Sequence, residues 1–247
     1  MIHATSIVRP TTVAIVERRG NKIGPHIYGT GLVLEDDCYV VTARHVIRNL
    51  RCSDFAVLRL FNRANKEARG WGTVTARYYH PGATYFGMPV DLALIEVQWN
   101  VKKEFPAAQP ADLTKLSVGL RVGLLGWPFG VALLNKLVVS AGGAHPSLTA
   151  GVISAIRPHE EQLPELLQLD LVAHEGSSGG PVFAADDGSV VGILTHGYPI
   201  KGILQLEDGK ISDTAIPTGL EFAEPVHKAI ALLRGVQQQQ IEPSDQP

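Results

Sequence analysis

The sequence predicts an all-β protein made of two tandem antiparallel six-stranded β-barrels and a short C-terminal helix. Three observations support this fold class. Short runs rich in Val, Ile, Leu and Thr occur on both sides of a Pro-containing link at 102–113, about six on each side. Gly, Pro, Asn or Asp separate these runs, as tight turns require. The chain shows no repeat of about 20–50 residues, so a repeat array is not expected.

The strand-like runs assign the first barrel to about 5–105 and the second to about 114–224, within one domain at 1–235. The runs of the first barrel are TTVAIVER, TGLVLE, CYVVTA, FAVLRL, WGTVTARYY and VDLALIEVQW. The runs of the second barrel are RVGLLGW, KLVVSA, TAGVISAI, LLQLDLVA, GPVFAA, VVGILTHG and GLEFAEP. HVIRNL predicts a short helix, and PVHKAIALLRG predicts the C-terminal helix at about 225–235, with Pro225 near its first turn. Residues 236–247 are expected to form a disordered polar tail.

The composition is that of an ordinary soluble globular protein, with 45% hydrophobic residues, 19% charged residues and a net charge of -2. Lys and Arg form no basic stripe, so nucleic acid is not an expected partner. No apolar run reaches the roughly 18 residues of a membrane helix, and the first residues lack a signal-peptide pattern. We therefore expect a cytoplasmic protein without a membrane partner. Cys38 and Cys52 are too few for a disulfide framework, so both are expected to be thiols, with a bridge between them left open.

The stretch HEGSSGGPVF at 174–183 places two serines on a glycine-rich bend before an apolar run. It is either a Ser/Gly turn between two strands or a turn that holds a nucleophile. A serine hydroxyl becomes a good nucleophile only when an imidazole takes its proton, and a carboxylate must orient that imidazole. His45 follows the apolar run YVVTA, and Asp91 begins LALIEV. Each is more often structural when taken alone, but the order His, Asp, Ser is that of a known hydrolytic triad.

Eight sequence blocks in order resemble the trypsin-like serine proteases, and among them the HtrA/Deg branch. The blocks span about 28–233 and read YGTGLVL, VVTARHVI, DLALIEV, SVGLRVGLLGWPFG, TAGVISA, QLDLVAHEGSSGGPVF, VVGILTH and GLEFAEPV. The resemblance implies a chymotrypsin-like fold and a serine endopeptidase that works through an acyl-enzyme intermediate. It also implies that catalysis needs no metal or organic cofactor, and no Cys/His cluster has zinc spacing.

The resemblance assigns the catalytic roles to His45 as general base, Asp91 as the acid that orients it, and Ser178, not Ser177, as nucleophile. The backbone N–H groups of Gly176 and Ser178 would form the oxyanion hole.

The substrate-binding residues implied by the resemblance are Val172 at the base of the primary pocket and Thr195, His196 and Gly197 on the strand that pairs with the substrate. With Val172 at the base of the pocket, a small or medium apolar residue is the expected preference. The expected partner is a protein or peptide substrate, and a homo-oligomer or a dedicated regulatory partner is left open.

The sequence departs from the branch in several places. Ser177 replaces Asn before the nucleophile, and His174 and Glu175 replace the usual Asn-Pro pair. The stretch at 131–148 is longer than usual, as either a regulatory loop or a longer hairpin. No PDZ domain is expected after the barrels.

Two other functions remain open from the sequence. A catalytically silent relative would bind extended peptides or a partner protein on the same barrels. An α/β-hydrolase-type esterase would use Ser178, Asp213 and His227, but its serine elbow must lead into a helix, and a β-type run follows Ser178 instead.

Overall fold

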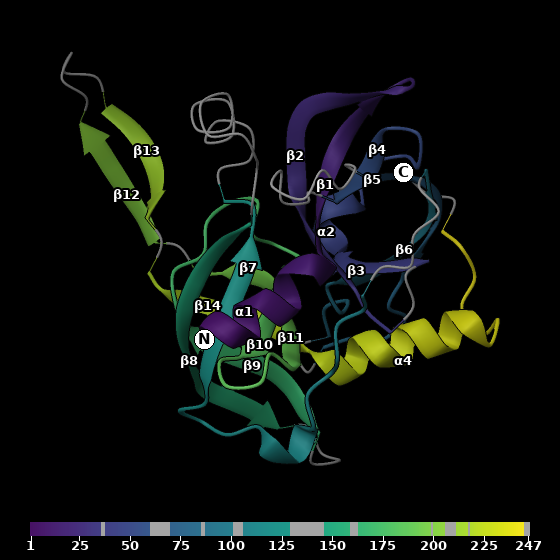
Figure 1. Ribbon diagram of the computed structural model, residues 1–247. Helices are drawn as coiled ribbons and strands as arrows, with labels where there is room; N and C mark the ends of the chain where they lie inside the picture. The colour runs from purple at the N-terminus through teal and green to yellow at the C-terminus, as the bar shows by residue number, and fades with distance from the viewer. Residues whose placement is uncertain are drawn as a thin grey trace.

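The computed structural model describes residues 1–35, 38–59, 70–84, 87–100, 106–128, 146–158, 163–198, 200–205, 211–216 and 218–244. The predicted fold class is confirmed, because two closed antiparallel barrels of six strands each are followed by a C-terminal helix. Figure 1 shows the two barrels next to each other, with the helix α4 running along one side of the molecule.

The first barrel closes in the order β1-β2-β3-β6-β5-β4. Its strands are β1 (Thr12–Arg19), β2 (Lys22–Val33), β3 (Tyr39–Ala43), β4 (Phe55–Arg59), β5 (Gly70–Tyr79) and β6 (Leu92–Trp99). The helices α1 (Ile2–Val8) and η1 (Arg9–Thr11) precede it, and the four-residue helix α2 (Arg44–Ile47) follows β3. The short helix predicted from HVIRNL is therefore present, whereas α1 was not predicted.

The second barrel closes in the order β10-β11-β14-β9-β8-β7. Its strands are β7 (Arg121–Gly126), β8 (Ser147–Pro158), β9 (Pro164–Asp170), β10 (Pro181–Ala184), β11 (Val190–Gly197) and β14 (Leu220–Pro225). The short helix η3 (Leu113–Lys115) precedes it, and α4 (Val226–Gln237) follows it. The strands β12 (Ile200–Gln205) and β13 (Ile211–Ile216), which the sequence did not predict, form a separate hairpin that projects from the barrels in Figure 1. The predicted run KLVVSA and most of 131–148 lie outside the described residues.

Strand β6 shows why several runs are apolar throughout. Successive side chains point to opposite faces of a strand. Ala93 and Ile95 point into the first barrel, whereas Leu92 and Leu94 join a core between the barrels. That core also takes residues from the second barrel and both terminal helices, namely Leu125, Phe183, Ile193, Ala4, Val8, Leu232 and Leu233. Because both faces of such a strand are buried, its sequence does not alternate between apolar and polar residues.

The link between the barrels is hydrogen-bonded to both of them. The Ala108 amide donates to the Val33 carbonyl over 2.9 Å, and the Val190 amide donates to the Gln109 carbonyl over 2.8 Å. The link therefore adds hydrogen bonds to the apolar contact that holds the two barrels at a fixed mutual position.

A buried ammonium joins α4 to two strands of the second barrel. Lys228 Nζ lies 2.6 Å from Glu165 Oε2 and 3.0 Å from Glu224 Oε2. Burial raises the pKa of Glu224, and the Lys228 ammonium opposes that shift. The Asp91 backbone N–H also donates to the Glu224 carboxylate, so this buried charge cluster reaches the first barrel.

The end of the chain contacts the first barrel. Residues 238–244 of the predicted polar tail are described, and the Ser244 amide donates to the Arg77 carbonyl over 2.8 Å.

Cys38 and Cys52 are both thiols, and burial raises the pKa of Cys52. Among the described residues, no helix has the length and apolar character needed to cross a membrane.

Replacing Lys228 with Met should lower the free energy of unfolding at pH 8 by about 3–5 kcal/mol, because two carboxylates lose their buried counter-ion. The difference from the wild type should narrow at pH 5, because burial raises the pKa of Glu224, so that lowering the pH favours its protonated form, which needs no counter-ion. Urea unfolding at both pH values measures it, with the exposed Lys115→Met as control. Equal stability of the two Met variants at pH 8 would contradict this role.

Candidate active site

His45 and Asp91 meet because β3 and β6 are paired. Ala43 lies opposite Leu92 in that pair, so the residues just beyond, on α2 and before β6, face each other. The His45 Nδ1–H donates to Asp91 Oδ2 over 2.7 Å, and the His45 backbone N–H donates to Asp91 Oδ1 over 2.9 Å. A neutral imidazole held in this way carries its proton on Nδ1 and leaves Nε2 as a proton acceptor.

Cations hold the short helix that carries His45. Arg77 is buried, and its Nη1 donates to the carbonyl of Ile47, the last residue of that helix, over 3.2 Å and to the carbonyl of Leu50, three residues beyond it. A positive charge is favourable at a helix C-terminus, where carbonyls lack partners. The guanidinium of Arg44 lies 4.7 Å from the ring centroid of Tyr79. These contacts fix the backbone from which the imidazole projects.

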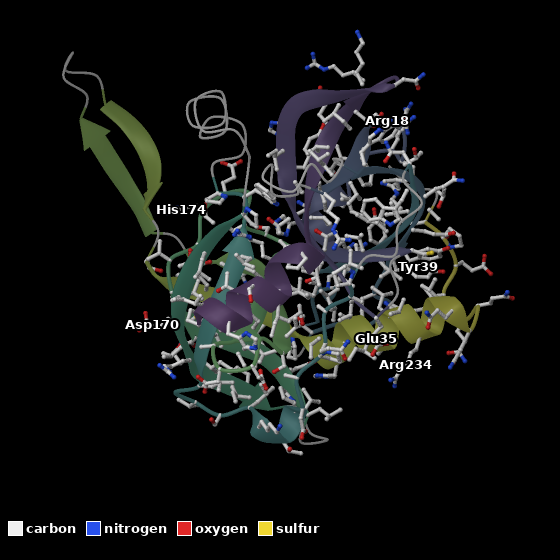
Figure 2. All side chains as sticks on the ribbon, in the orientation of Figure 1. Arg18, Glu35, Tyr39, Asp170, His174 and Arg234 are labelled. Atoms are coloured by element: carbon white, nitrogen blue, oxygen red, sulfur yellow. The ribbon has the colours of Figure 1, made fainter. Side chains whose placement is uncertain are left out.

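The serines lie just after a type II turn. The Ser177 amide donates to the His174 carbonyl over 2.9 Å, and Gly176 has a φ of 94°. A positive φ at the third residue defines a type II turn and favours glycine there. Because the central peptide of a type II turn is flipped relative to type I, this φ fixes which way the Gly176 N–H points. Figure 2 labels His174 and Asp170, which both lie on the second barrel.

The segment that follows this turn is docked on the first barrel through Thr30. The Thr30 amide donates to the Ser178 carbonyl over 2.9 Å, and Thr30 Oγ1 donates to the Gly176 carbonyl over 2.8 Å. Gly179 has a φ of 83°, and a Cβ there would lie 2.1 Å from the Thr30 carbonyl oxygen and 3.0 Å from the Ala43 amide nitrogen. Since Ala43 is two residues before His45, Ser178 is placed beside the strand that leads to the imidazole.

The two serines differ in their surroundings. Ser177 is only 4% exposed, and its Oγ lies 3.1 Å from the position of a Cβ on Gly126 in β7. Ser178 is half-buried. The Ser177 hydroxyl is therefore packed against the second barrel, which favours Ser178 as the more accessible of the two.

Thr195, His196 and Gly197 lie at the end of β11, close to the His45–Asp91 pair. Thr195 is buried, and its hydroxyl donates to the Phe222 carbonyl over 3.3 Å. The His196 ring stacks on Phe222, with ring centroids 5.1 Å apart. Burial lowers the pKa of His196, the Asp91 carboxylate opposes that shift, and His45 adds to it. His196 is thus within electrostatic reach of both residues.

A buried acid that the sequence reasoning missed, Glu221, lies next to two of the segments expected to bind the substrate. Val172 is exposed, and its place at the base of the pocket stays a prediction. The carboxyl of Glu221, however, is 5% exposed, and its Oε1 accepts a hydrogen bond from the Ala173 amide over 3.4 Å. Its Oε2 lies 2.4 Å from the position of a Cβ on Gly197. Burial raises the pKa of Glu221 to about 7. The sequence does show a Glu within the apolar run GLEFAEP, which could have drawn attention to it. Which residues lie next to this Glu, however, depends on the register between β11 and β14.

The esterase interpretation does not fit the fold. Ser178 is followed by the strand β10, and not by the helix that a serine elbow requires. The other two residues of the esterase interpretation lie on different elements: Asp213 is on the hairpin strand β13, and His227 is on the helix α4.

The chain resembles proteases in sequence and in fold. Residues 29–193 match the family described as trypsin-like peptidase domain. A probable periplasmic serine endoprotease, DegP-like, of Pseudomonas fulva is 32% identical over 177 residues, which are 70% of this chain and 30% of that protein. The corresponding Bartonella henselae protein is 30% identical over 181 residues, 72% of this chain and 29% of its own length. This chain therefore spans about a third of the length of the curated relatives it matches.

Solved structures agree on the fold. The HtrA-type protease AlgW with a decapeptide superposes with a TM-score of 0.64 at 17% identity, over 96% of this chain and 67% of that one. The serine endoprotease from Yersinia pestis gives a TM-score of 0.60 at 20% identity, over 97% and 67% of the two chains.

The expected cytoplasmic location is wrong. The curated relatives are named periplasmic endoproteases, which points to the periplasm. The absence of an apolar run in the first residues does not determine the cellular location of a protein, so the cytoplasmic expectation did not follow from it.

Replacing Gly179 with Ala should abolish stable docking of the serine-bearing segment, because the new Cβ would overlap the Thr30 carbonyl oxygen. Gly119→Ala is a matched control, since Gly119 has a φ of 88° with no atom within 4 Å of its Cβ position. The control should lose only about 1–2 kcal/mol for its left-handed backbone. Thermal unfolding compares the two variants, and equal losses would show that the close approach at Gly179 does not matter.

Proposed function

The chain belongs to the trypsin-like peptidase family, and we propose that it acts as a serine endopeptidase of the HtrA/DegP type. One observation carries the proposal. The serine-bearing segment is hydrogen-bonded through Thr30 to the barrel that holds the His45–Asp91 pair. Nothing in a peptide-binding surface requires an oriented imidazole together with an accessible serine, whereas acyl transfer requires both.

In the proposed reaction, Ser178 Oγ attacks the carbonyl carbon of the scissile peptide bond while His45 Nε2 takes the hydroxyl proton. The Asp91 carboxylate holds the imidazole and stabilises its charged form. The N–H groups of Gly176 and Ser178 donate to the developing oxyanion. The C–N bond then breaks as His45 returns its proton to the leaving amine, and water releases the acyl group from Ser178 by the same steps.

The substrate would bind in an extended form. Thr195, His196 and Gly197 would pair with its backbone, and the side chain before the scissile bond, the P1 residue, would lie between Gly197 and Val172. The proposed location is the periplasm, as the names of the relatives indicate. The proposed substrates are proteins or peptides, and assembly into a homo-oligomer or with a regulatory partner is part of the same proposal.

Labelling with a fluorophosphonate probe tests the nucleophile. Intact mass should show one adduct on the wild type and on Ser177→Ala, and none on Ser178→Ala. His45→Ala should react far more slowly, because the hydroxyl loses its base. Absence of label on the wild type, together with binding of extended peptides, would identify a catalytically silent binding protein instead.

Asp91→Asn tests the orienting acid without a change of shape. The amide would favour the wrong imidazole tautomer, and the same change in a well-studied triad lowers kcat by about 10⁴-fold. We expect a loss of kcat of that order with KM nearly unchanged, measured on a peptide substrate. A variant with wild-type kcat would remove Asp91 from the proposed triad.

A further inference from the structure

The buried carboxyl of Glu221 has a defined place in the proposed substrate site. Gly197 lies opposite Glu221 in the pairing of β11 with β14, so their side-chain positions share one face. The carboxyl lies in the space that a side chain on Gly197 would fill, with 2.4 Å between Oε2 and that Cβ position. Its other oxygen faces the Ala173 amide, five residues before Ser178.

These contacts put the carboxyl between the two segments that would flank the P1 side chain. One segment, Val172 and Ala173, leads directly into the serine-bearing turn. The other, His196 and Gly197, lies beside the His45–Asp91 pair. An acid at this position would face the substrate residue whose carbonyl carbon is attacked.

Glu221 also lacks the charge partner that a buried carboxyl normally has. Within the described part of the chain, its contact is the 3.4 Å hydrogen bond from one amide, and no Lys or Arg pairs with it. A carboxylate without a cation is expensive to bury. Glu224, three residues later on the same strand, has both Lys228 and the Asp91 amide.

We propose that Glu221 is the specificity-determining residue of this protease and selects a basic P1 side chain, Lys or Arg. The inference rests on the proposed function and replaces the apolar preference expected from Val172. A guanidinium or ammonium would supply the cation that the buried carboxyl lacks. Because burial raises the pKa of Glu221 to about 7, the carboxylate form predominates at pH 8, where the preference is best measured.

A peptide library that varies only at P1, assayed at pH 8, tests the proposal. The wild type should cleave mainly after Lys and Arg. Glu221→Gln keeps the shape and should lower kcat/KM for those peptides by at least about 100-fold, because a site built for a polar partner discriminates strongly. Cleavage after Ala, Val or Leu should not fall. Asp186→Asn removes the same charge from an exposed carboxyl and should leave the profile unchanged.

A second measurement reports binding of a basic group without a Glu221 variant and without peptide cleavage. Benzamidine, a mimic of the arginine side chain, should bind the wild type at pH 8 and protect it from fluorophosphonate. Fluorescence of p-aminobenzamidine reports the same binding on Ser178→Ala. A wild type that reacts with fluorophosphonate, cleaves after apolar residues and ignores benzamidine would overturn the proposal while leaving the protease intact. Failure to react with fluorophosphonate would instead count against the proposed function.

Discussion

The candidate active site depends on the contacts of one buried residue, Thr30, across the boundary between the barrels. Its amide and hydroxyl donate to the carbonyls of Ser178 and Gly176, and its hydroxyl accepts from the Trp127 amide over 3.2 Å. Its own carbonyl accepts from Thr42 Oγ1 over 2.7 Å. The proposed base lies on the first barrel and the proposed nucleophile on the second, so the proposed reaction depends on the hydrogen bonds that join the two barrels. A change in barrel docking would therefore change the distance between base and nucleophile before it unfolded either barrel.

Two buried glutamates on β14, Glu224 and Glu221, differ in the groups that compensate the charge of a buried carboxylate. Glu224 meets a buried ammonium and a backbone amide, and the second of these belongs to Asp91. It therefore links the C-terminal helix to the residue that orients His45. Glu221 is buried to a similar degree, but among the described residues its carboxyl accepts one long hydrogen bond, from the Ala173 amide. The charge of the first acid is compensated within the fold, whereas in our proposal a basic substrate side chain compensates the charge of the second.

Both barrels could be predicted because local signals carry them, whereas the order in which the strands pair was not predicted. Turn residues mark the ends of each run, and fully apolar runs such as β6 indicate burial on both faces. The assignment of His45, Asp91 and Ser178 came from their order within a known family pattern, and it stays a prediction. The place of Glu221 could not be predicted, because it depends on the register of β11 and β14. That register shifts at an irregularity between Leu194 and His196, which turns every later side chain to another face.

Because of this register, the residues at positions 197 and 221 share one space and depend on each other. The carboxyl occupies the volume that any side chain at position 197 would need, so a larger residue there would displace the acid or bar the substrate. The Glu221 carboxyl can keep this position because residue 197 is glycine; a Cβ there would require the carboxyl to move. Under this proposal Val172, which was expected at the base of the pocket, is a weak guide to preference, since a charged group nearby would outweigh one apolar contact. A chain with this backbone can therefore change its preferred substrate by a paired change on two neighbouring strands, without altering its catalytic residues.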